Sequence, residues 1–575
     1  MEQRSTLIEF KDFTFKYRAQ VEPTLHDINL KIYEGERVLI IGPSGSGKST
    51  ISNCINGLIP NVYSGEMQGE VMIEGRSLNG TPLSDISKMV GTVLQDTDGQ
   101  FIGLTVGEDI AFALENDCVP QDEMFKRVDE IARIVEMKDF LHQRPGELSG
   151  GQKQRVSMAG VMVEEAGILL FDEPLANLDP ATGKRAIELI DKIQRDTHKT
   201  VVIIEHRLED ALYCDADRII VMKEGRIAAD MTPDELLCTD VLEKTGIREP
   251  LYVTALKCAG VKLKSEDEAG QIGTLHIEPY AESVRKWYEA QVSAPAKVSE
   301  ETVLEVENVS FGYTPAKKVL RDISFTVHKG EMMAIVGKNG AGKTTLSSLI
   351  CGFMDPDTGV IRLNGTDMSG LSVKERGEHV GLIMQNPNQM ISKPMIFDEV
   401  ALGLRARGVD ESQIAPKVEN ILRVCGLYPY RNWPISALSF GQKKRVTIAS
   451  ILVLDPEIII LDEPTAGQDY RHYTEIMEFV RRINRESHTT IIMITHDMHL
   501  MLEYTDRAVV ISEGQLLADS TPAAILTDDV LSEKAYLKRT SLYDLSKMCG
   551  IDDADGFTDA FIRYEREHRG DSDNG

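Results

Sequence analysis

The stretch "RVLIIGPSGSGKST", residues 37–50, joins an apolar run to a glycine-rich loop. A continuous run of β-branched and aliphatic residues is typical of a strand buried on both faces of a parallel sheet. The loop from Gly42 to Ser49 fits the pattern G-x-x-x-x-G-K-[ST], in which backbone N–H groups wrap around phosphate oxygens. The stretch therefore predicts an α/β domain with a phosphate site where the strand meets the next helix.

The same pattern occurs a second time as "MMAIVGKNGAGKTT", residues 332–345. Other residues recur at a constant offset of 290: Gln95 as Gln385, Leu148 as Leu438, Asp172 as Asp462 and His206 as His496. The two lysines are 295 residues apart, so the first copy has about five extra residues, near "LIPNVYSGEMQGEV". A repeat of this length indicates a duplicated domain rather than a solenoid.

The polar stretch "YEAQVSAPAKVSEE", residues 288–301, is typical of a linker between the copies. We expect a first domain over residues 1–280, a linker over 281–301 and a second domain over 302–575. The end of the chain, "FIRYEREHRGDSDNG", is polar, and we expect a solvated tail from Phe561 onwards.

The composition narrows the functional class. The chain has 575 residues and a net charge of −28, and this acidic balance argues against a nucleic-acid partner. It contains no run of 18 apolar residues and no signal-like start, which predicts a cytosolic chain without a membrane span. Its eight cysteines stand singly, as expected of reduced thiols.

Carboxylates follow an apolar run in each copy. "ILLFDE" ends in Asp172 and Glu173, and "IIILDE" ends in Asp462 and Glu463. The aspartates are suited to hold Mg²⁺ through its water shell, and the glutamates are suited to polarise an attacking water. The alternative is that these carboxylates only cap turns.

Two further strings, "LSGGQKQRV" (148–156) and "LSFGQKKRV" (438–446), complete the pattern. The glycine loops, these strings and a "DEP" after a strand resemble the ATPase domains of ABC transporters. The resemblance implies two tandem nucleotide-binding domains, each a mostly parallel sheet with flanking helices and a helical signature subdomain. It also implies that two domains pair head to tail, with ATP between the phosphate loop of one and the signature helix of the other.

The resemblance assigns a role to each matching residue. Glu173, Glu463, His206 and His496 are the expected catalytic residues, and Asp179 and Asp469 the expected linking aspartates. Mg²⁺ is expected at Ser49, Gln95, Asp172, Thr344, Gln385 and Asp462. ATP is expected at Tyr17, Gly42, Pro43, Ser44, Gly45, Ser46, Gly47, Lys48, Ser49, Thr50, Ser149, Gly151 and Gln152, and at Tyr313, Gly337, Lys338, Asn339, Gly340, Ala341, Gly342, Lys343, Thr344, Thr345, Ser439, Gly441 and Gln442.

The segments after the two glutamines resemble the energy-coupling-factor subgroup, which imports vitamins and metal ions. Such an ATPase binds a transmembrane coupling subunit that carries a small substrate-binding membrane protein, at the cytoplasmic face of the membrane. The ATPase of a sugar or peptide importer is an alternative, and a ribosome-bound tandem ATPase is another. The transported solute cannot be named from this chain.

Acidic residues open the segments that would face the coupling subunit: Glu108, Asp109, Asp398 and Glu399. They are candidates to pair with its arginines. The alternative is that they simply favour the start of a helix, where carboxylates are stabilised.

Phe440 stands at the centre of the second signature string, where the first has Gly150. A bulky residue would disable that string only if the position required a positive φ. Ser439, Gly441 and Gln442 are retained, so we expect both nucleotide sites to be competent.

Overall fold

The apolar run before the first glycine loop forms strand β3 (Arg37–Ile41), and all five of its residues are buried. It lies between two parallel neighbours, β8 (Thr200–Ile204) and β9 (Arg218–Lys223). Beyond β8 come β7 (Ile168–Asp172) and β6 (Val90–Val93), again parallel. Strands covered on both faces bury every side chain, which explains why their sequences are continuously apolar.

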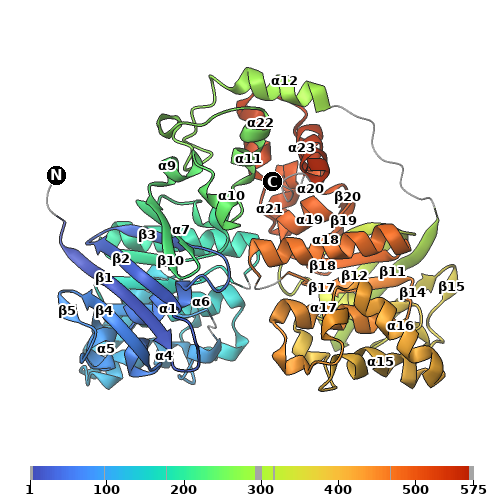
Figure 1. Cartoon of the computed structure of the whole chain (residues 1–575), viewed down its shortest axis with the longest axis horizontal. Helices are drawn as coiled ribbons and strands as arrows, with labels where there is room; N and C mark the ends of the chain where they lie inside the picture. The colour runs from blue at the N-terminus through green and yellow to red at the C-terminus, as the bar shows by residue number, and fades with distance from the viewer. Residues whose placement is uncertain are drawn as a thin grey trace. The chain divides into compact units, whose positions relative to one another are not determined.

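The computed structural model describes residues 4–95, 98–176, 178–291, 301–314, 317–465 and 468–568. The chain divides into two compact units, whose helices and strands can be followed in Figure 1. The first unit contains Met1–Arg285 and Asp469–Arg471, and the second contains Lys286–Gln468 and His472–Gly575.

The strands described in the first unit form two sheets. One has the order β10-β9-β3-β8-β7-β6, in which β10 (Arg226–Met231) pairs antiparallel with β9. The other has the antiparallel order β2-β1-β4-β5. Its strands are β1 (Thr6–Tyr17), β2 (Leu25–Tyr33), β4 (Gly65–Ile73) and β5 (Arg76–Ser77). Side chains from both sheets share one hydrophobic core.

The helices described in the first unit are α1 (Lys48–Ile55), α2 (Leu58–Asn61), α3 (Leu83–Met89), α4 (Val106–Asn116), α5 (Gln121–Ile134), α6 (Gly150–Met162), α7 (Pro180–Thr197), α8 (Leu208–Ala211), α9 (Pro233–Leu237), α10 (Val241–Thr245), α11 (Leu251–Cys258) and α12 (Ala281–Gln291), the last of which ends in the second unit. Short 3-10 turns occur at Asp98–Gln100, Lys138–Phe140, Pro145–Glu147 and Ser265–Asp267. Helices α4, α5 and α6 pack together as the helical subdomain.

The second unit repeats both sheets strand for strand. The large sheet has the order β16-β17-β18-β13-β19-β20 and the small one β12-β11-β14-β15. The bounds are β11 (Thr302–Thr314), β12 (Lys317–His328), β13 (Met332–Val336), β14 (Thr358–Leu363), β15 (Thr366–Asp367), β16 (Val380–Ile383), β17 (Ile458–Asp462), β18 (Thr490–Thr495), β19 (Arg507–Ser512) and β20 (Gln515–Ser520). The predicted α/β fold with two tandem domains is confirmed.

The helices described in the second unit are α13 (Lys343–Ile350), α14 (Val373–Arg376), α15 (Ile396–Ala406), α16 (Glu411–Val424), α17 (Phe440–Leu452), α18 (Tyr470–Ser487), α19 (Met498–Tyr504), α20 (Pro522–Thr527), α21 (Asp529–Ala535), α22 (Ser541–Met548) and α23 (Ala554–His568). Its 3-10 turns are Pro387–Gln389, Tyr428–Tyr430 and Ile435–Ala437. Helices α15, α16 and α17 form its helical subdomain (Figure 1).

The prediction of a solvated tail from Phe561 is wrong as far as His568. These residues belong to α23, in which Phe561 and Ile562 are buried. Trp287 of α12 contacts the rings of Phe561 and Tyr564. The apolar residues of this polar segment recur at helical spacing and cover a core. Residues 569–575 of the tail and 292–300 of the expected linker lie outside the described part of the chain.

Candidate functional site

The first glycine loop connects β3 to α1 and ends at a helix start that no side chain caps. Gly47 is the N-cap residue with φ of 100°, a backbone conformation that suits glycine. Lys48, the first residue of α1, is only 4% exposed and donates from Nζ to the carbonyls of Gly42 (2.7 Å) and Pro43 (3.0 Å). Burial lowers the pKa of Lys48 to about 8, although the charge of Glu173 opposes the shift.

The second loop has the same geometry between β13 and α13. Gly342 is the uncapped N-cap with φ of 105°. Lys343 Nζ donates to the carbonyls of Gly337 (2.7 Å) and Lys338 (3.0 Å). In both units the loop lysine therefore donates to the carbonyls of the first two residues of its loop.

The loops fit the phosphates of ATP. The uncapped N–H groups at a helix start, next to a buried ammonium, form a site for an anion. In the first loop, the buried Ser46 Oγ has no hydrogen-bond partner in the described structure. Gly42 gives the loop its tight path, because a Cβ there would lie 2.5 Å from the carbonyl oxygen of Met222.

An aromatic residue stands near each loop at the end of the small sheet. Tyr17 OH lies 3.3 Å from Thr50 Oγ1, and Tyr313 OH lies 3.2 Å from Thr345 Oγ1. Both tyrosines also pack edge-to-face on a phenylalanine two residues earlier. This position beside the start of α1 or α13 is compatible with the predicted contact to ATP.

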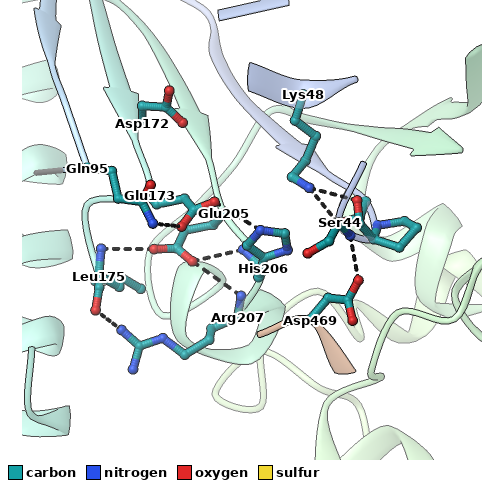
Figure 2. Close-up of polar contacts among 12 residues, drawn as sticks. Ser44, Lys48, Gln95, Asp172, Glu173, Leu175, Glu205, His206, Arg207 and Asp469 are labelled. Carbon is teal, nitrogen blue, oxygen red and sulfur yellow. Dashed lines mark hydrogen bonds and ion pairs between the residues drawn. The ribbon is translucent and has the colours of Figure 1, made fainter. Parts of the chain in front are cut away.

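Glu173 is the centre of a cluster at the end of β7, drawn in Figure 2. Its Oε2 accepts a hydrogen bond from Gln95 Nε2 (2.6 Å), and its Oε1 lies 2.9 Å from His206 Nε2. Burial raises the pKa of Glu173, but the hydrogen bond and charge of His206 outweigh it, and the pKa is lowered overall. The structure thus brings together three residues that lie far apart in the sequence.

In the second unit the glutamate also contacts the histidine, but its other carboxylate oxygen has a different partner. Glu463 Oε1 lies 2.6 Å from His496 Nδ1. Its Oε2 accepts a hydrogen bond from Thr495 Oγ1 (3.3 Å), whereas the first unit has Glu205 at that position. Glu205 is 3% exposed and accepts from the N–H groups of Leu175 and His206, both at 2.9 Å.

The donor set beside each loop fits Mg²⁺. Asp172 and Asp462 end their strands, and Asp172 Oδ2 accepts from Ser52 Oγ (3.1 Å). Burial raises the pKa of both carboxyl groups, that of Asp462 to about 6. Together with the hydroxyls of Ser49 and Thr344, they offer hard oxygen ligands of the kind that Mg²⁺ prefers.

Each signature string begins two residues before a helix and continues into its first turns. Ser149 is the N-cap of α6, and it and Gln152 cap each other's N–H groups. Ser439 and Gln442 do the same for α17. The residues predicted to meet a phosphate therefore also define their own helix starts, as a capping box does.

Phe440 is the first residue of α17 and does not have a positive φ. The side chain is 44% exposed. A Cβ at the matching Gly150 would meet only Leu178, at the ordinary contact distance of 3.7 Å. Neither position therefore requires glycine, and the geometric objection to "LSFGQ" does not apply.

Each aspartate that the family resemblance singled out accepts a hydrogen bond from a backbone N–H group. Asp179 caps α7 by accepting from the N–H of Thr182 (2.9 Å). Asp469, which groups with the first unit, accepts from the N–H of Ser44 (2.5 Å, Figure 2).

Most of the acidic residues at the starts of α4 and α15 accept hydrogen bonds from nearby backbone N–H groups. Asp109 accepts from the N–H groups of Ile102 (2.8 Å) and Gly103 (3.0 Å), and Glu108 caps α4 with Thr105. Glu399 is 5% exposed and accepts from the N–H groups of Ser392 (2.9 Å) and Lys393 (2.6 Å). Glu108 therefore fits the helix-start alternative, whereas Asp109 and Glu399 bind the loop before their helices, and Glu399 is buried.

Three functional candidates are not among the residues predicted from the sequence: Gln154, Lys444 and Glu205. Gln154 and Lys444 occupy the same position in the two signature strings, and both are buried. The difference between glutamine and lysine at this position is visible in the two strings. Glu205 was also visible, as the residue that replaces Thr495 before the histidine.

The chain matches a family described as "ABC transporter" over residues 25–176 and 320–466. Residues 239–311 match a family described as "ATP-binding cassette cobalt transporter". Among the described residues, no helix is sufficiently long and apolar to span a membrane.

Similar proteins cover almost the whole chain. An ABC transporter ATP-binding protein of Clostridium perfringens is 57% identical over 567 residues, which is 99% of this chain and 100% of the relative. One from Enterococcus faecalis is 58% identical over 98% of this chain and 100% of the relative. A solved structure, CbiO1 of Clostridium perfringens, described as part of the ABC transporter complex CbiONQ, is 32% identical with a TM-score of 0.38, over 41% of this chain and 94% of that one.

Both matched regions contain the glycine loop, the signature string and the strand that ends in aspartate and glutamate. The chain belongs to the ATP-binding proteins of ABC transporters and is an ATPase with two domains of that family in one polypeptide.

Proposed function

We propose that this chain is the fused ATPase of an energy-coupling-factor type importer. ATP hydrolysis would drive the uptake of a vitamin, a vitamin precursor or a metal ion. The observation that carries the proposal is the match of residues 239–311, between the two ATPase regions, to a family described as a cobalt transporter. The proposed partners are a transmembrane coupling subunit and a small substrate-binding membrane subunit, and the proposed location is the cytoplasmic face of the membrane.

The proposed chemistry uses the same residues in each unit. Lys48 and Lys343 bind the phosphates of ATP with the loop N–H groups. Mg²⁺, held by Ser49, Gln95 and Asp172 or by Thr344, Gln385 and Asp462, would neutralise charge on the phosphate oxygens. Glu173 and Glu463 accept a proton from the attacking water at a carboxylate oxygen.

His206 and His496 orient these glutamates. The contact from His206 Nε2 to Glu173 Oε1 leaves the other carboxylate oxygen to Gln95. In the second unit, the contact from His496 to Glu463 plays the same part. A glutamate that is fixed on both oxygens is restricted to one orientation, which favours proton transfer.

Glu173→Gln and Glu463→Gln test the assignment of the bases. An amide cannot take the proton, so each variant should still bind ATP while the turnover of its own site falls by roughly 10²- to 10⁴-fold. The measurement combines nucleotide affinity with the steady-state ATPase rate. Wild-type turnover in both single variants would exclude these glutamates as the bases.

The transporter class is tested by its partners. The chain is purified from membranes in detergent, and the chains that copurify with it are identified by mass spectrometry. A coupling subunit with a small binding subunit is expected. A pair of large permease subunits would indicate a sugar or peptide importer, and ribosomal proteins would indicate a soluble tandem ATPase.

A further inference from the structure

The signature helices of the two units are tied to different segments. In the first unit, the side-chain amide of Gln154 on α6 donates to the carbonyl of Pro174, just after Glu173. In the second unit, Lys444 on α17 instead donates from Nζ to the carbonyls of Met384 (3.2 Å) and Gln385 (2.7 Å). The longer side chain therefore reaches the glutamine segment that follows β16.

Lys444 is unusual because it is a lysine that is 1% exposed. A buried ammonium is stable only when it is hydrogen-bonded and near opposite charge. Both conditions hold, because the two carbonyls accept its protons and Asp462 and Glu463 lie nearby. Burial lowers the pKa of Lys444 to about 8, and the charges of these two carboxylates oppose the shift.

The two predicted Mg²⁺-sensing glutamines are also held differently. Gln95 is fixed through its side chain, which donates to Glu173. Gln385 is fixed through its backbone carbonyl, which accepts from Lys444. The contact between Gln385 and Lys444 carries a full charge, and hydrogen bonds of that kind are about twice as strong as neutral ones.

We propose that Lys444 is a positioning residue of the second unit, which ties the backbone of Gln385 to the signature helix and so presents that glutamine to the nucleotide in a fixed place. Among the described residues of the first unit, Gln154 makes no such contact with the segment of Gln95. This inference rests on the proposed role of Gln385 at the nucleotide. The two units would then respond differently to nucleotide. In the second unit Lys444 joins α17 to the segment of Gln385, whereas in the first unit Gln154 joins α6 to Pro174.

Hydrogen exchange in the full nucleotide-free chain tests whether Lys444 holds the segment of Met384 and Gln385, independently of ATP turnover. Lys444→Met keeps the volume and removes both hydrogen bonds, so amide exchange in residues 383–391 should become at least about tenfold faster. Exchange in α17 should be unchanged. Gln154→Met is the matched control, which should accelerate exchange near Pro174 and leave residues 90–95 unaffected.

Lys444→Arg should restore slow exchange in residues 383–391, because a guanidinium can donate to the same carbonyls. If Lys444→Met does not fold, Lys444→Gln is measured instead, and its shorter amide should also fail to protect this segment. Unchanged exchange in residues 383–391 of a folded variant, or an equal increase throughout α17, would overturn the proposal.

Steady-state kinetics test whether the hydrogen bonds of Lys444 to Met384 and Gln385 affect ATP turnover. A contact that positions Gln385 for turnover predicts that Lys444→Met lowers kcat several-fold and leaves KM for ATP nearly unchanged, with recovery in Lys444→Arg. If exchange accelerates while kcat stays at the wild-type value, Lys444 anchors the segment but does not act on turnover. That result would overturn the positioning role and leave the ATPase assignment intact.

Discussion

Glu173 and Glu463 have left-handed backbone conformations, with φ of 50° and 45°. A glutamate in this region is strained by about 1–2 kcal/mol. The N–H of each is held by a strand carbonyl, that of Ile204 or Ile494, at 2.9 Å. In both units, therefore, a hydrogen bond to the sheet holds the proposed base, Glu173 or Glu463, in its strained backbone conformation.

Comparison of Glu463→Gly with Glu463→Ala measures this strain. Both variants lose the same carboxylate contacts, but only glycine accepts a positive φ without cost. We expect the glycine variant to be more stable by about 1 kcal/mol in urea unfolding, with no activity from that site in either variant. Equal stabilities would mean that the backbone relaxes when the carboxylate is removed.

The exposed Phe440 ring predicts a mild phenotype. Phe440→Gly should change the ATPase rate by no more than about threefold, because Ser439 and the backbone N–H groups remain. Ser439→Arg and Ser149→Arg should both be severe, since each removes a helix cap and adds a bulky cation. Loss of activity in Ser149→Arg alone would show that "LSFGQ" is a silent copy.

The starts of α4 and α15 are built by carboxylates that fold back onto the preceding loop. Asp109 and Glu399 occupy equivalent places, and each accepts from two successive N–H groups. Hydrogen bonds from N–H groups to a charged carboxylate are stronger than those between neutral groups, so these side chains stabilise the turn as well as the helix.

Glu399→Ala should therefore lower the free energy of unfolding of the second unit by about 1.5–3 kcal/mol. Asp398→Ala is a suitable control on the same turn, because Asp398 is half exposed and pairs with the exposed Arg405. Its effect should be within about 0.5 kcal/mol. Urea titration followed by circular dichroism measures both, and similar losses would contradict the buried role of Glu399.

The elements that the sequence predicted are those whose residues face similar surroundings along their length. Strands such as β7 and β17 are apolar throughout because both faces are covered, so the pattern alone identifies them. The small antiparallel sheet was not predicted. In its β4 the first six residues are exposed or partly exposed and only Val71 and Ile73 are buried, and its pairing with β1 is non-local.

The site divides in the same way. The loop lysines and the residues at the ends of strands follow from motifs, since their chemistry requires fixed spacing. The partners of Lys444 could not be predicted from a motif, because 60 residues of helices and turns separate Lys444 from Met384 in the sequence. Only the folded subdomain brings the ammonium to those carbonyls.

At the scale of the whole molecule, the cysteines report on each unit separately. Cys118 is exposed, Cys54 is buried in the first unit, and Cys351, Cys425 and Cys549 are buried in the second. Burial raises the pKa of the thiols of Cys351 and Cys425 to about 12, which suppresses the reactive thiolate.

Maleimide labelling of the native chain should therefore modify Cys118 quickly and the four buried thiols only on unfolding. In a urea series read by peptide mass spectrometry, the labelling of Cys54 gives the unfolding midpoint of the first unit, and the other three buried thiols give that of the second. Rapid native labelling of Cys425 would contradict the packing of α16 against α17.

The two units are parts of a single polypeptide, and this fact has an evolutionary consequence. An ATPase pair made from two identical chains receives every substitution twice, so neither half can acquire a trait of its own. In this chain one copy can change while the other is conserved, and the pair is always synthesised in a one-to-one ratio. A fused gene can keep a substitution in one copy alone. The present sequence has two such differences at matching positions, Gln154 against Lys444 and Glu205 against Thr495.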